Sequence, residues 1–383
     1  MLKILNILVD DKFIDGLIEV LEFTKGENKQ DYIMIGNGVI EKFQYITKAE
    51  YLKQIDCKEC LDFINNNDYD LVILHSLSCI PWFKIGQIDS KIKVLWKAWG
   101  FDLYRTPSEI QPFVKLKRFH PITKKYWLRH YKGKIYLNFK TWIYSQIHKK
   151  EIESAINRID FFSGCLPNEF DLMKKNNFFR AKHVELPYFH LNSNYTNENK
   201  DVFQELGNNI LIGNGAVIAN NHFDIFKSIS AIDISDKQII VPLSYGGDSF
   251  YIKDIITYGS KVFGKHFSPI LDFMSLQEYN TLLSTCSYAI LGYEQQAALG
   301  NAAELLWLGV KLFLPQMSVN YKYFRDNGYK VFTIENDLTE EQISQPLTLN
   351  EKLQNREAFL KTMSIDINLE KINKIYKIIE KSN

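Results

Sequence analysis

Three polar turns in the second half of the chain carry residue types that bind an anion. Gly213-Asn214-Gly215 comes directly after the apolar run Ile210–Ile212, and residues 242–248 and 292–301 follow two further apolar runs. Glycines let backbone amides approach a ligand, and a helix that starts after such a turn favours negative charge. Because turns of this kind meet at the carboxyl edge of a parallel sheet, they predict one shared site for a nucleoside diphosphate.

The residues expected to contact this ligand are mainly glycines, amides and polar side chains at the turns. A second interpretation stays open for several of them, since Asn221 and His222 can simply cap a helix. Glu304 can accept from a ribose hydroxyl or only complement a helix dipole. The predicted set is Gly213, Asn214, Asn221, His222, Tyr245, Gln295, Gln296, Gly300, Asn301 and Glu304.

Two residues in the first half of the chain have the chemistry of a general base. Asp102 and His75 each follow an apolar run of strand length. A carboxylate or an imidazole at such a position can take a proton from a hydroxyl group. The alternatives are that Asp102 caps a helix after Gly100 and that His75 is a satisfied residue at a strand end. We predict Asp102 as the catalytic base, with His75 as the second candidate.

No metal or other cofactor is expected. Asp68-Tyr69-Asp70 has the form of a divalent-metal motif, but it precedes the apolar run Leu71–Leu74 and so belongs to the sheet edge opposite the ligand turns. Cys57 and Cys60 form a single pair, whereas structural zinc takes four ligands and no second pair follows at suitable spacing.

Alternating strand and helix patterns must position these residues. The resulting fold class is α/β, with two Rossmann-like doubly wound domains facing a central cleft and a C-terminal closing helix, the arrangement of GT-B enzymes. In the first half the predicted strands are Ile4–Val9, Tyr32–Ile35, Leu71–Leu74 and Val94–Trp96, with helices over Lys12–Phe23, Ala49–Asn65 and Pro81–Ile88. In the second half the predicted strands are Ile210–Ile212, Gln238–Pro242, Lys261–Gly264, Tyr288–Leu291 and Val310–Leu314, with helices over Phe223–Ser230, Phe250–Tyr258, Leu276–Cys286 and Ala302–Leu308.

Composition changes along the chain set the predicted domain boundaries. Residues 192–201 contain one hydrophobic residue, Tyr195, and are expected to form a linker. Leu369–Lys381 has apolar residues at helical spacing and predicts an amphipathic helix. The predicted division is an N-terminal acceptor domain over residues 1–191, the linker 192–201, a nucleotide-sugar-binding domain over 202–350, and a C-terminal helical segment over 351–383.

Charge is unevenly distributed along the 383 residues. The chain has 46 Lys and Arg against 45 Asp and Glu, for a formal net charge of +1. Residues 110–150 hold eleven Lys and Arg with no acidic residue, so removing these eleven charges leaves −10 on the rest. Nucleic acid is therefore a poor partner, and the basic, aromatic insertion 110–150 predicts contact with an anionic membrane surface. The alternative is a solvated insertion whose aromatic residues cap the first domain.

No apolar run is long enough to cross a bilayer, and no signal peptide is evident. We therefore expect a cytoplasmic protein that is peripheral on the inner face of the cell membrane.

The sequence resembles a known family on motifs in both halves. The motifs are His75, Trp99-Gly100-Phe101-Asp102-Leu103-Tyr104, Gly213-Asn214 with Asn221-His222, Pro242 with Tyr245-Gly246, Tyr279 with Leu282-Leu283, and Gln295-Gln296 with Gly300-Asn301. With them, the chain is similar to the TDP-N-acetylfucosamine:lipid II N-acetylfucosaminyltransferases, glycosyltransferase family 56.

This resemblance implies a metal-independent GT-B enzyme of polysaccharide assembly. It would move a deoxyamino or fucose-type sugar from a nucleoside-diphosphate carrier, TDP in the family, to a lipid-linked glycan. Glu294 stands where the family has an arginine, so backbone amides at a helix start, or a lysine such as Lys253 or Lys265, would neutralise the leaving diphosphate. Other readings are a non-catalytic, membrane-recruited assembly scaffold and a different GT-B nucleotide-sugar enzyme.

Overall fold

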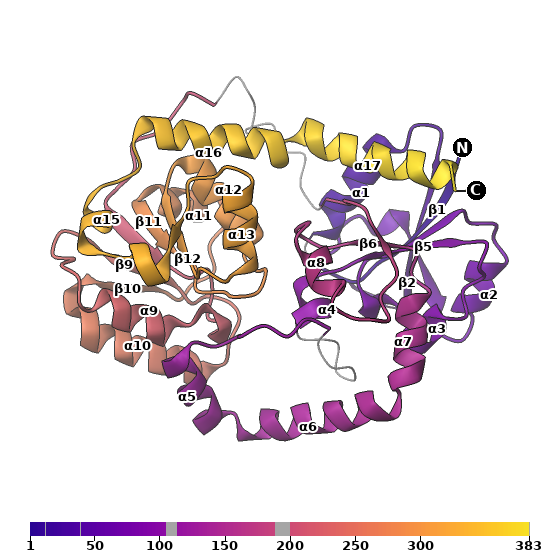
Figure 1. Cartoon of the computed structure of the whole chain (residues 1–383), viewed down its shortest axis with the longest axis horizontal. Coiled ribbons are helices and arrows are strands. Elements are labelled where there is room, and N and C mark those ends of the chain that lie inside the picture. The colour runs from indigo at the N-terminus through magenta and orange to yellow at the C-terminus, as the bar shows by residue number, and fades with distance from the viewer. Residues whose placement is uncertain (12, 39, 105–112, 188–199, 383) are drawn as a thin grey trace. The chain divides into compact units, whose positions relative to one another are not determined.

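The computed structural model describes residues 1–11, 13–38, 40–104, 113–187 and 200–382. The chain divides into two compact units, each built around one parallel sheet (Figure 1). The N-terminal unit contains Met1–Lys115, Tyr136–Ser193 and Ile365–Asn383, and the C-terminal unit contains Leu116–Ile135 and Asn194–Ser364.

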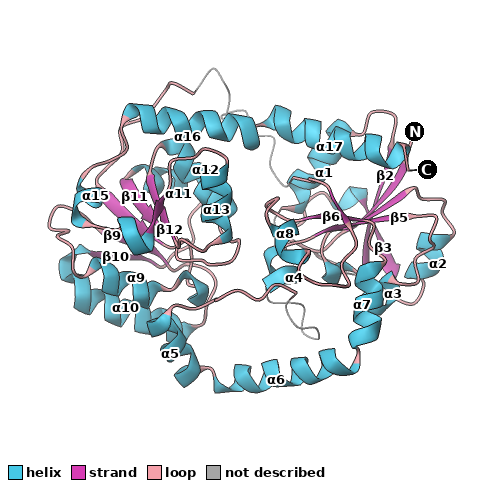
Figure 2. Ribbon diagram, in the orientation of Figure 1, coloured by secondary structure: helices cyan, strands magenta, loops and turns pink. Residues whose placement is uncertain are grey.

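The sheet of the N-terminal unit has seven parallel strands in the order β3-β2-β1-β4-β5-β6-β7. Figure 2 draws its strands in magenta and the helices around them in cyan. The central strands are buried on both faces, and all four residues of β4 are buried. Such strands read as continuous apolar runs, which is why the sequence reveals them. Their bounds are β1 Lys3–Ile7, β2 Lys29–Gly36, β3 Leu52–Asp56, β4 Leu71–Leu74, β5 Lys93–Lys97, β6 Phe161–Ser163 and β7 Lys182–His183.

Helices cover this sheet. The last of them, α17, packs beside α1, and its apolar stripe joins the same core (Figure 1). The buried residues of that stripe include Ile372, Ile375 and Ile379, so the amphipathic helix predicted near the C-terminus is confirmed. The helices are α1 Ile14–Thr24, α2 Cys60–Asn65, α3 Trp82–Ile85, α4 Gly100–Tyr104, α7 Lys149–Asn157, α8 Glu169–Met173 and α17 Ile365–Glu380, with 3-10 turns η1 Ala49–Tyr51 and η2 Leu77–Cys79.

The C-terminal unit has a six-stranded parallel sheet in the order β10-β9-β8-β11-β12-β13. The chain runs outward from β8 in one direction and then from β11 in the other, so the strand order reverses between these two neighbours. This is the switch point at which α/β sheets bind ligands. The strands are β8 Asn209–Ile212, β9 Ile239–Pro242, β10 Phe267–Ile270, β11 Cys286–Ile290, β12 Lys311–Leu314 and β13 Phe332–Thr333.

The helices of the C-terminal unit include α5, which comes from the first half of the sequence and contacts α9. They are α5 Pro121–His130, α9 His222–Ile229, α10 Ser249–Phe263, α11 Leu276–Ser284, α12 Leu299–Leu308, α13 Val319–Asp326, α14 Ile334–Asp337, α15 Glu340–Ser344 and α16 Leu349–Thr362, with 3-10 turns η3 Ile218–Asn220 and η4 Gly264–His266. Helix α6, Lys132–Ile147, contains the sequence boundary between the two units.

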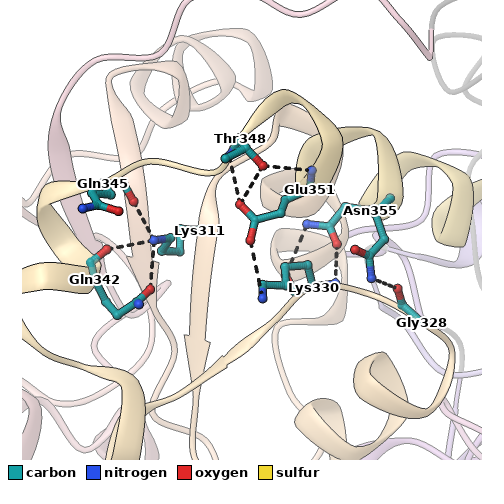
Figure 3. Close-up of polar contacts among 9 residues, drawn as sticks. Lys311, Gly328, Lys330, Gln342, Gln345, Thr348, Glu351 and Asn355 are labelled. Atoms are coloured by element: carbon teal, nitrogen blue, oxygen red, sulfur yellow. Dashed lines mark hydrogen bonds and ion pairs between the residues drawn. The ribbon is translucent and has the colours of Figure 1, made fainter.

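Polar contacts fix α15 and α16 to the second sheet (Figure 3). The Lys311 ammonium of β12 donates to the carbonyl oxygens of Gln342 and Gln345, which satisfies a buried charge. Lys330 pairs with Glu351 of α16 at 3.4 Å. These contacts hold the far end of the unit and leave the carboxyl edge of the sheet to the turns that follow β8, β9 and β11.

Two predicted elements differ in the structure. The predicted helix Ala49–Asn65 is instead η1, the edge strand β3 and the short helix α2. Only Ile55 of β3 is buried, so this edge strand lacks the apolar run of the central strands. The predicted strand Lys261–Gly264 is the end of α10, which stops where Gly264 adopts a φ of 56°, and the strand β10 follows at Phe267.

The units also differ from the predicted boundaries. Residues 116–135 of the insertion 110–150 belong to the C-terminal unit rather than to the domain 1–191. Residues 365–383 of the segment 351–383 belong to the N-terminal unit. The predicted linker 192–201 lies almost entirely outside the described residues. Side-chain contacts distant in sequence decide these assignments, and composition does not report such contacts.

Candidate functional site

The three predicted turns lie at one edge of the C-terminal sheet. They follow β8, β9 and β11, which are neighbours in the order β9-β8-β11, and they leave the carboxyl ends of these parallel strands. The first two turns are also joined by the backbone, because the Ala216 N–H donates to the Tyr245 carbonyl at 2.8 Å. The structure therefore brings the three turns together at the switch point.

Asn214 is the side chain that connects all three turns. Its amide nitrogen donates to the Tyr245 hydroxyl at 2.8 Å. Its oxygen accepts from the Tyr293 hydroxyl of the third turn at 3.0 Å and from the Asn220 amide at 3.4 Å. Asn214 is 7% exposed, so this network is largely shielded from water. The Asn214 side chain therefore joins the three turns by hydrogen bonds.

Gly213 forms a cradle lined by two polar atoms without partners. Its φ is 71°, and a Cβ at this position would lie 2.9 Å from His222 Nε2 and 3.2 Å from Asn220 Oδ1. Within the described residues neither of these buried atoms makes a hydrogen bond. Leaving a buried polar atom unpaired costs about 1–3 kcal/mol, which a ligand in the cradle would relieve.

His222 presents a neutral ring to this cradle. Its Nδ1 lies 2.9 Å from the Tyr251 hydroxyl, and burial lowers the pKa of the imidazole to about 3. When Tyr251 donates to Nδ1, the ring hydrogen is on Nε2 and can be donated to a phosphate oxygen. The Asn220 amide nitrogen donates to the Gly215 carbonyl at 2.7 Å, so its free oxygen can accept from a ligand hydroxyl.

The third turn leads directly into α12. Gln295 and Gln296 are buried within it, and Ala298 at its end has a φ of 53°, a strained conformation for a residue with a side chain. Three further predicted residues lie in the first two turns of α12, where the helix dipole favours an anion. Gly300 is exposed, Asn301 and Glu304 are half-buried, and burial raises the pKa of Glu304.

In the N-terminal unit both predicted base candidates are fully buried at the ends of neighbouring strands. Asp102 Oδ1 accepts from the Ser76 hydroxyl at 2.9 Å, and Oδ2 accepts from the Trp99 N–H at 3.0 Å and the Trp96 indole at 3.3 Å. Burial raises the pKa of Asp102 to about 6 in spite of these donors. His75 Nε2 lies 3.0 Å from Asn6 Oδ1, and burial lowers its pKa to about 3.

Asp70 belongs to Asp68-Tyr69-Asp70, the sequence not expected to bind a metal. Its carboxylate accepts the Lys3 N–H at 2.7 Å, at the start of β1 and β4. This is the amino edge of the sheet, as the sequence predicts for it.

A comparison with protein families identifies the family of this chain. A family model described as 4-alpha-L-fucosyltransferase, glycosyl transferase group 56, matches residues 166–362, just over half of the chain. The chain belongs to glycosyltransferase group 56. The matched range contains β8 to β13 and all three turns of the candidate site.

Solved glycosyltransferase structures share the GT-B fold of this glycosyltransferase over its whole length. A glycosyltransferase from Rickettsia africae has a TM-score of 0.63 at 14% identity and covers 100% of this chain and 99% of its own. The Anabaena protein HepE, solved with UDP and glucose, has a TM-score of 0.59 at 10% identity over 98% of this chain and 100% of its own. An alpha-glucosyltransferase with UDP and a 13-mer DNA has a TM-score of 0.56 at 12% identity, covering 99% of both chains.

The structure gives Glu294 of this glycosyltransferase a partner that the sequence did not reveal. Glu294 is buried, and its carboxylate lies 3.1 Å from His120 Nε2. The His120 N–H donates to Asn221 Oδ1 at 2.8 Å, and the Asn221 amide donates to the Gly292 carbonyl at 2.7 Å. Asn221 therefore holds the third turn against the segment before α5, and its side chain is occupied by the protein.

Aspartates of the C-terminal unit hold α5 in place. Asp224 accepts the Ile122 and Thr123 N–H groups at 2.9 and 2.8 Å, which caps the start of the helix. The Tyr126 and Tyr131 hydroxyls donate to Asp254 and Asp248. These contacts use backbone N–H groups and tyrosine hydroxyls, not the basic side chains of the insertion.

The two lysines considered as diphosphate partners are exposed. Lys265 lies in η4 directly before β10, so it is at the amino edge of the sheet, opposite the turns. Lys253 lies on α10. The position of Lys265 is therefore wrong for the predicted role, whereas the N-terminus of α12 is at the correct edge.

Proposed function

We propose that this glycosyltransferase binds a nucleoside-diphosphate sugar at the turns after β8, β9 and β11. It would transfer a fucose-type or deoxyamino sugar from TDP to a lipid-linked glycan in polysaccharide assembly. The observation that carries the proposal is the Gly213 cradle, where His222 Nε2 and Asn220 Oδ1 lack partners among the described residues. The structural neighbour HepE from Anabaena was solved with UDP and glucose and also with UDP-glucose, which supports a nucleotide sugar here.

The leaving diphosphate is the charge that the site has to stabilise. We propose that backbone amides of the glycine turns, the His222 ring and the N-terminus of α12 do this without a divalent metal. Gln295, Gln296 and Asn301 are expected to orient the sugar and the nucleotide. Activity that survives chelation by EDTA is the expected result, and loss of activity that added magnesium restores would contradict it.

The pairing of Glu294 bears on the alternative of a non-catalytic scaffold. A carboxylate at this position favours that alternative, because it would repel a diphosphate. His120 Nε2 lies 3.1 Å from this buried carboxylate, so Glu294 faces an imidazole of its own unit. The residue at this position therefore gives no reason to expect an inactive site.

Thermal-shift measurements with TDP, UDP and GDP test the donor site. A ligand present at 100 times its Kd stabilises the native state by about 2.7 kcal/mol, or roughly 5–10 °C for a unit of this size. His222→Phe should abolish the shift. The matched control is His266→Phe at the amino edge, whose Nδ1 also lies 2.9 Å from a single partner, the Lys237 carbonyl. Equal shifts in both variants would refute the assignment.

The second part of the proposal concerns the acceptor side and α6. None of the helices in the described part of the chain is long and apolar enough to cross a membrane. Helix α6 nevertheless exposes a set of large apolar side chains, and it also carries Lys132, Lys134 and Lys140. The exposed set is Ile135, Tyr136, Leu137, Phe139, Trp142, Ile143 and Ile147. We propose that α6 contacts the anionic inner face of the cell membrane, where a lipid-linked acceptor would be found.

Vesicle sedimentation tests this contact. The protein should bind vesicles that contain phosphatidylglycerol and not vesicles of phosphatidylcholine alone. A variant with Phe139→Ser and Trp142→Ser should lose binding, whereas Phe273→Ser, which changes an 84% exposed aromatic residue elsewhere, should not. Binding that ignores anionic lipid or the α6 substitutions would refute the proposal.

A further inference from the structure

A chain of hydroxyl groups leads from the surface of the N-terminal unit to the buried Asp102. Ser76 Oγ lies 2.9 Å from Asp102 Oδ1 and 2.7 Å from Ser78 Oγ. Ser76 is completely buried, whereas Ser78 is exposed. Ser76 and Ser78 lie two and four residues after the end of β4, at the carboxyl edge of the first sheet.

The number of hydroxyl hydrogens decides which serine donates to which group in this chain of hydroxyls. Ser76 has one hydroxyl hydrogen, which it donates to Asp102 Oδ1. Ser76 Oγ also accepts the Ser78 N–H at 2.9 Å, so the short contact between the two hydroxyls requires Ser78 to donate. The lone pairs of Ser78 Oγ then remain available to accept a proton from a molecule outside the protein.

The backbone at Ser76 is held in an unfavourable conformation. Its φ of 120° is rare for a residue with a side chain, and β4 ends two residues before it, at Leu74. Such strain persists only where the surrounding contacts enforce it, and it is concentrated at functional sites. Here the strained residue is the one that connects the exposed and the buried ends of the hydroxyl chain.

We propose that Ser78 is a catalytic residue that accepts the proton of the acceptor hydroxyl and passes it through Ser76 to Asp102. The inference rests on the proposed glycosyl transfer. The acceptor O–H bond breaks as its oxygen bonds to the anomeric carbon of the donor. The acceptor proton goes to Ser78, the Ser78 proton to Ser76 and the Ser76 proton to Asp102. The bond between the anomeric carbon and the diphosphate breaks, and the diphosphate leaves with its electron pair.

The relay explains how a fully buried carboxylate can act as a base. Asp102 Oδ2 is occupied by the Trp96 and Trp99 donors, and the carboxylate is 0% exposed, so no substrate can touch it directly. Burial raises the pKa of Asp102 to about 6, near the value that suits a base at neutral pH. The geometry therefore separates the group that contacts the acceptor from the group that stores the proton.

The titratable neighbours of Asp102 do not compete for this proton near neutral pH. His75 is neutral, since burial lowers its pKa to about 3. Burial raises the pKa of the Cys79 thiol, and it raises that of Cys165 to about 12, so both remain protonated. Lys97, which is also buried, donates to the Gly164 carbonyl at 2.6 Å, and burial lowers its pKa.

A purely structural role gives a different expectation for Ser78. Ser76 also caps the 3-10 turn η2 by accepting the Ser78 N–H. Ser78→Ala keeps this backbone bond and removes only the exposed hydroxyl. If capping were the whole function of the pair, the substitution would leave turnover unchanged.

The test measures TDP release from TDP-N-acetylfucosamine with an undecaprenyl-diphosphate-linked glycan as acceptor. Ser78→Ala should lower kcat by about 100-fold or more, the usual contribution of a positioned base, without changing the KM for the donor or the melting temperature. Ser78→Thr should recover most of the rate, because it restores the hydroxyl. Ser90→Ala, an exposed serine of the same unit, is the matched control.

The pH dependence of kcat is a second measurement, and a purely structural role of Ser78 would not change it. The kcat of the wild-type protein should rise through about pH 6 and then level off, whereas the residual kcat of Ser78→Ala should lack this rise. A Ser78→Ala variant within threefold of an active wild type overturns the relay alone. A wild type that neither binds TDP nor releases it overturns the proposed function itself.

Discussion

Gly213→Ala provides the sharpest test of the donor site. Gly213 has a φ of 71°, and an added Cβ would lie 2.9 Å from His222 Nε2. Gly328 of the same unit has a φ of 82° and no atom within 4 Å of an added Cβ. The two substitutions therefore impose the same backbone strain, and only the first fills the cradle.

The expected magnitudes follow from these contacts. A side chain in the left-handed region costs about 1–2 kcal/mol, so Gly328→Ala should lower the free energy of unfolding by that amount. Gly213→Ala adds overpacking of about 1–3 kcal/mol, because the buried rings and amides around it cannot move away freely. At about 2–4 °C per kcal/mol, the melting temperature should fall further for Gly213→Ala than for Gly328→Ala.

Donor affinity is the decisive measurement. Losing hydrogen bonds to a charged phosphate costs about 1.5–3 kcal/mol, which corresponds to a Kd increase of about 10- to 100-fold for Gly213→Ala. Gly328→Ala should bind as the wild type does. Calorimetric titration with TDP, well below the lower melting temperature, makes the comparison on folded protein. Equal Kd values for all three proteins would refute the reasoning about the cradle.

Three further predictions concern buried charges. His120→Ala should lower the free energy of unfolding by about 1–3 kcal/mol in urea titrations, because it removes the polar neighbour of the buried Glu294 carboxylate, and adding Glu294→Gln should recover part of the loss. Asp102→Asn should cost about 1–3 kcal/mol, since an amide cannot accept from all three donors, and should abolish turnover while TDP affinity is unchanged. Because burial raises the pKa of Asp102 to about 6, its protonated form favours folding. The resulting contribution to the free energy of unfolding, about 3 kcal/mol, is present below about pH 4 and is lost as the pH rises through 6. Melting temperatures of the wild type and of Asp102→Asn, measured across this pH range, would show the loss.

The central strands were predictable because burial on both faces leaves a direct pattern in the sequence. Leu71–Leu74 coincides with β4, and Ile210–Ile212 lies within β8. The edge strand β3 lacks this pattern, since Ile55 is its one buried residue. The other difference is the predicted strand Lys261–Gly264, which is the end of α10. The last residues of this helix, Val262 and Phe263, are followed by Gly264, and this composition is also that of a short strand.

The candidate site was predictable where topology alone decides positions. Parallel strands bring their carboxyl ends to one edge, so three turns far apart in sequence could be placed together before the structure was known. Pairings across long sequence separations leave no such signal. Asn221 and His120 are 101 residues apart, and nothing in either local sequence identifies the other. Burial of Asp102 was equally hidden, because the partners Ser76 and Trp96 lie in other elements.

Two helices of the basic insertion, α5 and α6, lie in different side-chain environments. In α5 the acidic partners come from the second half of the chain: Asp224 caps the helix, and Asp248 and Asp254 accept from tyrosines on it. In contrast, α6 combines Lys132, Lys134 and Lys140 with exposed apolar side chains.

Near anionic headgroups each of these lysines contributes about 1 kcal/mol, so the three provide roughly 3 kcal/mol before any apolar burial is counted. A single weak electrostatic contact of this size does not hold a protein on a membrane, whereas the same charge combined with interfacial aromatic side chains does. Substituting the three lysines should therefore weaken vesicle binding in a salt-dependent way, and substituting the aromatic residues should weaken it at every salt concentration. This difference separates the two contributions, and a protein that responds to neither set of substitutions would place the membrane contact outside α6.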